Sequence, residues 1–588
     1  MPLLRRCLRF LVPCLACAIS PAGHAAGSAG PANDAGSYNV RAFGATGDGK
    51  TLDTDAINRA IEAAAAAGGG TVVFPAGSYL SFSIRLKSHL TLRLEAGCRI
   101  IAAKASPGFG GYDAAEPNVP GDQFQYQDFG HSHFHNSLIW GEDLEDVAIT
   151  GPGLIFGQGL SRANGFRPGR NGASAAGPNN TPTPGDTAGQ APRAAPAGVP
   201  LPTPDRGGNK SIALKNCRNV TLSGFSILQG GWFGLLASGV DNFTIANVKV
   251  DTNRDGFDID CCRNVRISDC TVNAINDDAI VLKSTYVFGV LRPTENVTIT
   301  GCEVTGYDPG SCFDGTYRHA QALAVDRDGP TGRIKIGTES GGDFKNITIS
   351  NAVFDRSRGL AIESVDGAHV EDIAISNITM RDVSNAPIFI RLGSRMREQA
   401  PEGTTIGSVR RVSISNVVVY DADPRYPSII SGIPGHDVED IKLSDIRILC
   451  RGGLTLDHAA KQPAEMASTF FAAPRRGGPV PPRDAFDVPE REVEYPEPSM
   501  FGVLPAYGFF IRHAKGIELN NVDVGFTQED RRPAFVLDDV TNADFQHVKA
   551  QKASGIPTIV FRKVEDFTAR ACTPLPDTKI PQVDRREI

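Results

Sequence analysis

The chain lacks a large excess of charge of either sign, and it lacks a long apolar run. Its 588 residues carry a net charge of -7, with 59 Lys and Arg against 66 Asp and Glu. No basic footprint indicates a nucleic-acid partner, and we expect none. The apolar run at residues 10–19 is shorter than a membrane-spanning helix requires, so we also expect no membrane span.

The amino terminus has the pattern of an export signal. Arg5, Arg6 and Arg9 precede the apolar run, and small residues follow as far as Ala26. We therefore predict a signal peptide at 1–26, followed by a Gly/Ala/Ser linker at 27–37. The mature protein should be secreted or periplasmic.

The cysteines lack the spacing of a zinc site. Of the twelve in the chain, nine remain once residues 1–26 are removed, so at least one thiol stays free or pairs between chains. Cys261, Cys262, Cys270 and Cys302 fall in consecutive repeats, and either disulfides or buried packing would suit them. We expect no bound metal and no cofactor.

A short phrase of alternating apolar and polar residues recurs along the chain. Examples are NVTLSGFSI from Asn219, NFTIANVKV from Asn242 and NVRISDCTV from Asn264. These starts are 23 and 22 residues apart, and longer steps follow. A step of this size suits one coil of a parallel β-helix, whose coils are about 4.8 Å apart. An antiparallel sandwich or propeller would need hairpin turns, which are not evident.

The sequence predicts an all-β fold, a single-stranded right-handed parallel β-helix over residues 38–575. Asp53 or Thr54 can begin a helix that runs to Ala67, and such a helix would cap the open end of the stack. Two stretches rich in Pro and Gly, 159–208 and 452–498, are predicted to be mobile insertions. Residues 576–588 are predicted to be a carboxyl-terminal tail.

Two acidic segments lie one repeat apart. Asp255 in NRDGFDID and Asp277 in INDDAIVLKS differ by 22 residues, and Asp278 follows directly. Adjacent coils would gather the three carboxylates in one patch, where repulsion raises the pKa of at least one. An acid beside an ionised base is what hydrolysis of a glycosidic bond requires. Turn-forming roles for such residues and a calcium site are the rival interpretations.

The segment from Tyr38 to about Val524 resembles the polygalacturonase family of glycoside hydrolases (family 28), in its bacterial branch. Asn253-Arg254-Asp255 and Asn276-Asp277-Asp278 match two of the family's motifs with one change each. The resemblance implies that Asp277 is the general acid, whereas Asp255 and Asp278 activate water for inversion. Residues 495–513 also resemble a late stretch of bacterial members.

Two other motifs of the resembled family are missing. Gly332 stands where the family has a His, and Ala361 and Glu363 stand where it has an Arg and a Lys that hold a uronate carboxylate. Glu363 would repel such a carboxylate. Eight residues are candidates for substrate binding. Six cations could hold a carboxylate in place of the missing pair: Arg254, Lys283, Arg333, Lys335, Arg358 and Arg391. Glu339 and Glu363 could instead bind sugar hydroxyls.

We predict a glycoside hydrolase that acts on a pectin-type polysaccharide or oligosaccharide by inverting acid/base hydrolysis. Its partner is a carbohydrate substrate. A calcium-dependent pectate lyase, which works by elimination, and a non-catalytic carbohydrate-binding solenoid are the alternatives.

Overall fold

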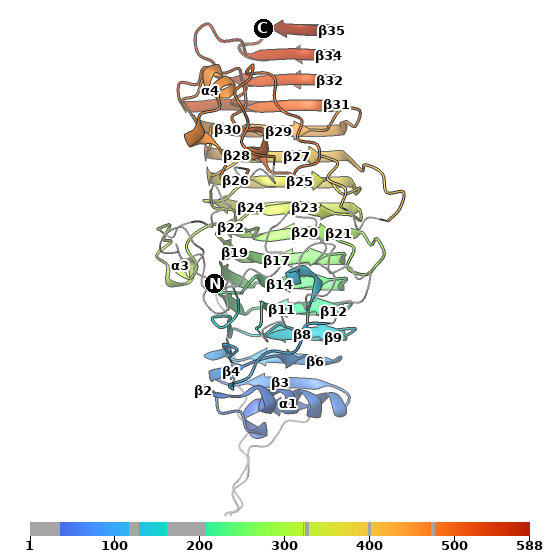
Figure 1. The fold of residues 1–588 in the computed structure, drawn as a ribbon, viewed down its shortest axis with the longest axis vertical. Helices are drawn as coiled ribbons and strands as arrows, with labels where there is room; N and C mark the ends of the chain where they lie inside the picture. The colour runs from blue at the N-terminus through green and yellow to red at the C-terminus, as the bar shows by residue number, and fades with distance from the viewer. Residues whose placement is uncertain are drawn as a thin grey trace, which may run out of the picture. The chain divides into compact units, whose positions relative to one another are not determined.

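The repeated phrases form successive coils of a right-handed parallel β-helix in the computed structural model (Figure 1). The structure describes residues 36–106, 108–116, 129–161, 207–320, 323, 329–397, 401–471 and 477–588. The predicted signal peptide lies outside these residues. The fold prediction is confirmed, because each coil contributes strands to three faces, and each strand pairs in parallel with its counterparts in the neighbouring coils.

The first face carries the repeated phrases. Its strands are β1 Ser37–Asn39, β3 Gly70–Phe74, β6 Leu90–Leu94, β9 Glu145–Thr150, β12 Arg218–Ser223, β15 Asp241–Ala246, β18 Arg263–Ser268, β21 Thr294–Thr300, β24 Phe344–Asp355, β26 His369–Val383, β28 Ser408–Ala422 and β30 Val438–Gly452. The later strands of this series are long and continue around a corner of the coil.

The second face consists of shorter strands. They are β2 Asp48–Leu52, β4 Gly77–Ser81, β7 Cys98–Ala102, β10 Leu154–Phe156, β13 Ser226–Leu228, β16 Lys249–Thr252, β19 Thr271–Ala274 and β22 Glu303–Thr305.

The third face, called the site face below, holds the acidic segments. Its strands are β5 Ile84–Arg85, β8 Ile139–Glu142, β11 Lys210–Lys215, β14 Phe233–Ser238, β17 Asp255–Asp260, β20 Ile280–Ser284, β23 Ile334–Ser340, β25 Leu360–Ser364, β27 Ile388–Leu392, β29 Ser428–Ser431 and β31 Phe509–Gln528. The last coils contain β32 Phe535–Gln546, β33 Lys549–Ala550, β34 Ile559–Arg570 and β35 Thr578–Glu587.

Alternation within each phrase places the apolar residues inside the coil. In β18, Val265 and Ile267 are buried while Asn264 and Arg266 face outward. The same alternation in the neighbouring coils stacks Ile and Val into one continuous core. This burial is the main force that drives the coils together.

The Asn that opens each phrase stabilises a corner of the coil. Asn242, Asn264 and Asn296 have φ of 52°, 55° and 57°, a left-handed conformation that Asn tolerates better than most residues. Their side chains form a ladder: Asn264 donates to Asn242 at 3.2 Å, and Asn296 donates to Asn264 at 3.1 Å. The phrase therefore encodes the turn as well as the strand.

Both ends of the stack are covered. Helix α1, Thr54–Ala66, begins after Asp53 as predicted and packs Ile57 and Ile61 against the first coil. At the other end β35 pairs with β34 in the antiparallel direction. The predicted tail at 576–588 therefore contains the last strand of the sheet, because an antiparallel strand ends the parallel stack.

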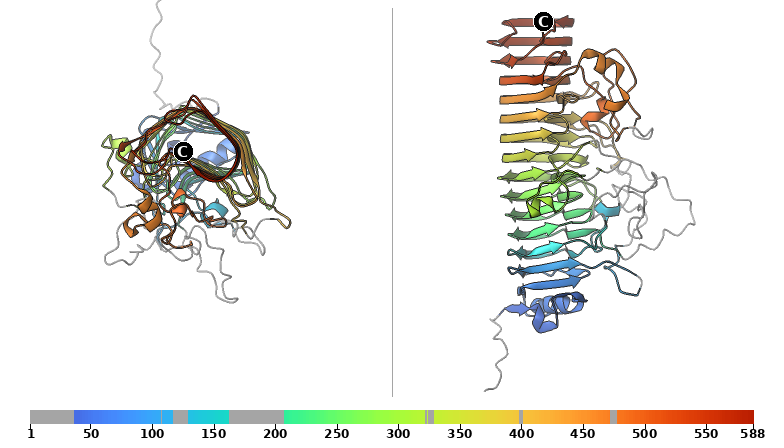
Figure 2. Two further views of the ribbon diagram at one scale, coloured as in Figure 1. Left: turned by 90° about the horizontal axis from the view of Figure 1, so that it is seen from above. Right: turned by 90° about the vertical axis from the view of Figure 1, so that its left-hand side faces the viewer.

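The remaining helical turns lie in the connections. They are η1 Val40–Phe43, α2 Phe129–Ser132, α3 Ser311–Asp314, α4 Leu456–Lys461, η4 Ala464–Met466 and η6 Pro498–Phe501. The segments bearing α2 and α4 lie on the same side of the stack (Figure 2). No helix among the described residues has the length and apolarity needed to cross a membrane.

The two predicted insertions differ in outcome. Most of 159–208 lies outside the described residues. The described part of 452–498 packs Phe470, Phe486 and Val488 against Phe389 and Phe510 of the site face, which is not what its Pro/Gly-rich composition predicts. Scattered aromatic residues provide enough apolar surface to hold this segment against the coil.

The nine cysteines of the described chain are free thiols. Cys261, Cys262, Cys270 and Cys302 are buried, and they pack as small residues in successive coils. Of the two interpretations offered by the sequence, buried packing is the one observed.

The Asn ladder gives a test of the corner. Replacing Asn264 with Val removes both ladder hydrogen bonds and forces a β-branched residue into a left-handed conformation. We expect a loss of about 1–3 kcal/mol in the free energy of unfolding, visible as a lower thermal midpoint. Asn264→Gly loses the same hydrogen bonds without the backbone strain and should lower the midpoint less. Equal losses in the two variants would contradict this account of the corner.

Candidate active site

The three predicted carboxylates meet at one edge of the site face. Asp255 begins β17, and Asp277 and Asp278 directly precede β20. The register pairs Phe257 with Ile280, which sets Asp255 beside Asp278 on the next coil. One carboxylate oxygen from each of Asp255, Asp277 and Asp278 lies within 4.8 Å of the other two.

The Asn residue of each acidic motif fixes the turn that carries the acids. Asn276 donates to the side-chain oxygen of Asn253 at 2.8 Å, and both side chains are buried. The main-chain N–H of Asn276 also donates to the carbonyl of Asn253 at 3.0 Å. Matching residues in adjacent coils thus hold the two acidic turns in the same conformation.

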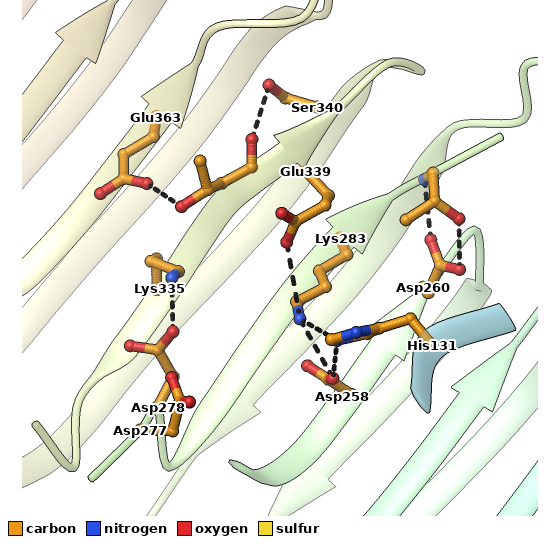
Figure 3. A network of polar contacts seen from close by, with 12 residues as sticks. His131, Asp258, Asp260, Asp277, Asp278, Lys283, Lys335, Glu339, Ser340 and Glu363 are labelled. Carbon is orange, nitrogen blue, oxygen red and sulfur yellow. Dashed lines mark hydrogen bonds and ion pairs between the residues drawn. The ribbon is translucent and has the colours of Figure 1, made fainter. Parts of the chain in front are cut away.

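Cations accompany two of the three acids. Arg254 contacts Asp277 at 2.6 Å. One oxygen of Asp278 accepts a hydrogen bond from Nε of Arg333 at 2.9 Å, and the other oxygen forms an ion pair with the ammonium of Lys335. Arg333 and Lys335 were predicted to clamp a substrate, but their side chains are only 3% exposed and are directed at Asp278. Figure 3 shows Lys335 and Asp278 in contact.

The environment separates the acids electrostatically. Burial, together with repulsion from Asp277 and Asp258, raises the pKa of Asp255 well above its usual 3.8. Burial also acts to raise the pKa of Asp278, but Lys335 and Arg333 outweigh it and leave that pKa below the usual value. The site therefore holds one carboxyl whose surroundings favour the protonated form, Asp255, close to one whose surroundings favour the ionised form, Asp278.

A second buried group lies on the next coils. Glu363 of β25 accepts a hydrogen bond from the hydroxyl of Thr338 at 2.8 Å, and the hydroxyls of Thr338 and Tyr495 are 3.1 Å apart. Burial raises the pKa of Glu363 to about 7, even though Lys335 and Arg333 act to lower it. Glu363 is fully buried, so it does not face solvent as a sugar-binding residue would.

Glu497 ties the 477–508 connection to the site. It accepts hydrogen bonds from Arg333 at 3.2 Å, from Arg358 at 2.7 Å and from Asn385 at 2.9 Å. Glu497 is 2% exposed. Arg358, a predicted substrate-binding residue, thus lies in the site but is paired with a carboxylate of the protein itself.

A third group surrounds Lys283 (Figure 3). Its ammonium donates to Asp258 at 3.1 Å and lies 2.7 Å from Nε2 of His131 and 3.5 Å from Glu339. Burial opposes ionisation of Glu339, but Lys283 with Arg397 and Arg395 lowers its pKa. Lys283 and Glu339, both predicted, are therefore partners of one another.

Arg391 is the one predicted site residue that serves a different purpose. Its guanidinium donates to the carbonyls of Gly432 at 2.7 Å and of Glu490 and Arg491 at 2.9 Å. The side chain is 1% exposed and anchors the 488–492 connection to β27 and β29. The structure does not bring it to the acids.

Sequence reasoning missed four residues of the site: His131, Asp258, Tyr495 and Glu497. Asp258 had a signal, since it lies three residues after Asp255 in the same strand. Tyr495 and Glu497 lie in the late stretch that resembles bacterial members, although neither was singled out. His131 comes from the connection that bears α2, and nothing local in the sequence predicts where it docks.

Two apolar clusters border the site along the helix axis. Toward the amino terminus, Phe134 and Trp232 pack on Ala213 and Leu236 of the site face. Toward the carboxyl terminus, Phe501 and neighbouring residues of the 453–508 connection cover Phe389 and Ile429. Of the three acids, Asp277 retains the most exposure, 18% of its side chain against 3% for Asp278.

The charged groups do not favour a metal ion at the three acids. A hard cation would need carboxylate oxygens that are free to coordinate it. Both oxygens of Asp278 contact fixed cations, and Asp277 contacts Arg254. The positive charges of Arg254, Arg333 and Lys335 would repel a divalent ion, which would have to displace these side chains to reach the carboxylates.

The raised pKa of Glu363 predicts a specific dependence of stability on pH. The pKa of Glu363 is about 7 in the folded state and 4.5 ordinarily. Between these two pH values the folded protein therefore holds a proton on Glu363 that the unfolded chain has released. The stabilisation is complete below pH 4.5 and is lost as the pH rises through about 7. The thermal midpoint of the native protein minus that of Glu363→Gln should fall over this range. A flat or rising difference would contradict the burial argument.

Two family models match parts of the chain. A rhamnogalacturonase A/epimerase, pectate lyase-like model matches residues 37–124, and a right-handed β-helix region model matches residues 206–322. Both descriptions agree with the observed coils.

Curated relatives and a solved structure extend the similarity. A probable polygalacturonase of Vitis vinifera is 26% identical over 364 residues, which cover 58% of this chain and 60% of that protein. Alginate lyase 7 of Azotobacter vinelandii is 69% identical, but over 42 residues, 7% of this chain and 5% of that protein. The structure of an exopolygalacturonase from Thermotoga maritima is similar with a TM-score of 0.52 and 21% identity, covering 71% of this chain and 88% of that one.

These similarities differ in what they establish. The solved structure supports the fold alone, and the match to the alginate lyase covers a short segment. The match to the plant polygalacturonase spans about 60% of that relative and more than half of this chain. The coils, the acidic motifs and these relatives together show that the chain is similar to polygalacturonases.

Proposed function

We propose that the protein hydrolyses glycosidic bonds of a pectic polysaccharide or oligosaccharide. The observation that supports this most strongly is the cluster of Asp255, Asp277 and Asp278, whose oxygens lie within 4.8 Å, in which the pKa of Asp255 is raised by burial and that of Asp278 is lowered by Lys335 and Arg333. Acid/base hydrolysis requires a protonated and an ionised group at the same pH. The relation to polygalacturonases supports the choice of pectin as the polymer.

We assign the base to Asp278 and the acid to Asp277. Asp278 is kept ionised by Arg333 and Lys335, so it can accept a proton from water as the oxygen of that water bonds to the anomeric carbon. Asp277 is the most exposed of the three and is best placed to reach the glycosidic oxygen, which leaves as a hydroxyl when it is protonated. Asp255 carries the proton of the resting cluster and, at this separation, can supply it to Asp277.

This assignment changes one role that the resemblance implies. Asp255 was expected to activate water together with Asp278. Burial raises the pKa of Asp255 and so favours its protonated form, which makes it a weaker candidate for the base than Asp278. Asp255 is therefore proposed as the proton source of the cluster.

The stereochemical course is proposed to be inversion, as the resemblance implies. Carboxyl groups of inverting enzymes are usually about 6.5–9.5 Å apart, whereas the oxygens here lie within 4.8 Å. Asp277 and Asp278 are consecutive residues, and Asp255 lies on the preceding coil. Asp278 is also a poor nucleophile, because cations contact both of its oxygens.

The borders of the site favour action at a chain end. The Phe134/Trp232 cluster and the 453–508 connection lie on either side of the acids along the helix axis. We propose that the segments over these clusters shorten the stretch of polymer that can bind. The similar Thermotoga maritima structure is itself named an exopolygalacturonase. We further propose that the protein works outside the cytoplasm, after removal of the predicted signal peptide.

The calcium-dependent lyase is the weaker alternative. Elimination of this kind needs a bound calcium ion, and the cations around Asp277 and Asp278 oppose one. The non-catalytic solenoid is also weaker, because a binding surface has no need for two carboxyls held in opposite protonation states.

Replacing Asp277 or Asp278 with Asn tests the function. Each variant should fold but lose about 10²–10⁴-fold in kcat on pectic oligosaccharides, measured as release of reducing sugar, since a proton-transfer group is gone. Asp269→Asn is the matched control, because Asp269 occupies a turn with φ of 56° where Asn fits equally well. Its activity should equal that of the native protein.

The same assay separates the alternatives. A chelator should leave the activity unchanged, and no product should absorb in the ultraviolet. NMR of the first product formed should show the inverted anomer. Native protein that releases no reducing sugar from any pectic fraction would overturn the proposed function.

A further inference from the structure

The cations near the acids are all matched by carboxylates of the protein. Among the described residues, seven cationic side chains beside the acids have a carboxylate partner, whereas Arg391 of β27 donates to main-chain carbonyls away from the acids. The pairs are Arg254 with Asp277, Lys283 with Asp258, Arg333 and Lys335 with Asp278, Arg358 with Glu497, Arg395 with Asp366, and Arg397 with Glu339.

These pairs are buried, which makes them costly to exchange. The side chains of Arg333, Lys335 and Arg358 are 3%, 3% and 5% exposed. Drawing one of them toward a substrate carboxylate would leave a buried carboxylate of the protein without its partner. Breaking a buried pair in this way is strongly unfavourable, because it leaves a charge buried without compensation.

The strand register shows how a uronate clamp has been lost. Lys335 of β23 pairs with Ala361 of β25, the position where the resembled family has its Arg. The cation therefore lies one coil earlier, and it faces Asp278 instead of solvent. At the second position Glu363 replaces a cation with a carboxyl, beside Thr338 and Tyr495.

The groups on β23 and β25 suit hydroxyls better than a carboxylate. Glu339 is kept ionised and Glu497 accepts three hydrogen bonds, so each adds negative charge to the coils beside Asp278. Oxygen Oε1 of Glu363 has no hydrogen-bond partner, and the nearest guanidinium nitrogen of Arg333 is 3.9 Å away. These carboxyls are buried and do not contact a sugar directly, but a carboxyl at the position of Glu363 offers no cation to a uronate and disfavours an anion nearby.

We propose that the sugar whose bond is cleaved is a neutral pyranoside and not a uronate. The substrate class would then be the neutral-sugar units of a pectic polysaccharide, at a chain end or on a side chain. The proposal rests on the hydrolase function above and specifies its substrate. It explains why the acidic cluster is retained while the carboxylate clamp is not.

The test compares matched substrates that differ at one carbon. Oligogalacturonides and the same oligosaccharides after reduction of the carboxylates to primary alcohols share linkage and ring configuration. Oligosaccharides of rhamnogalacturonan with neutral ends form a second set. For the native protein we expect kcat/KM at least about 10-fold higher on the neutral member of a cleaved pair, equivalent to about 1.4 kcal/mol.

The outcomes distinguish this inference from the proposed function. A preference for the uronate member overturns the inference and leaves the hydrolase function intact. If the protein cleaves neither set and no other pectic fraction, the proposed hydrolase function is wrong. Glu363→Gln provides a second readout, because removal of its negative charge should raise the uronate-to-neutral ratio of kcat/KM above pH 7, where Glu363 is ionised. An unchanged ratio counts against the inference.

Discussion

The ion pairs that Asp278 makes with Arg333 and Lys335 are the interaction on which the site depends. They hold Asp278 ionised in a buried position, where an isolated carboxylate would take up a proton. Asp255, one coil away and without such contacts, has a pKa that burial raises well above its usual value. The same two cations are thereby withdrawn from the substrate. One local arrangement thus creates the acid/base pair and removes the means of holding a uronate.

The coil register makes this arrangement possible. Asp255 begins β17, Asp278 lies just before β20, and Lys335 belongs to β23, and these are consecutive strands of the site face. A shift of one residue in any of these strands would turn its side chain into the core. The Asn ladder and the stacked core therefore maintain the function as well as the fold.

The sequence alone predicts the features that repeat. The phrase length, its alternation and the Asn at each corner predict the β-helix, and the 22-residue step between Asp255 and Asp277 predicts their proximity. Features created by long connections escape this reasoning. His131 and Glu497 reach Lys283 and Arg333 across 152 and 164 residues, so no periodicity marks them. The prediction that Arg333 and Lys335 bind the substrate was also made without knowledge of their partners. Both side chains form ion pairs with Asp278 in the folded protein.

The measurement that tests the central claim most directly is the order in which the carboxyls titrate. In protein labelled with ¹³C at the Asp carboxyls, the Asp→Asn variants at 255, 277 and 278 assign the three resonances. Asp278 should stay ionised to below pH 3.8, and Asp255 should titrate well above it. If Asp255 and Asp278 titrate together, or if Asp278 takes up its proton at the higher pH, the separation of acid and base proposed for this site is wrong.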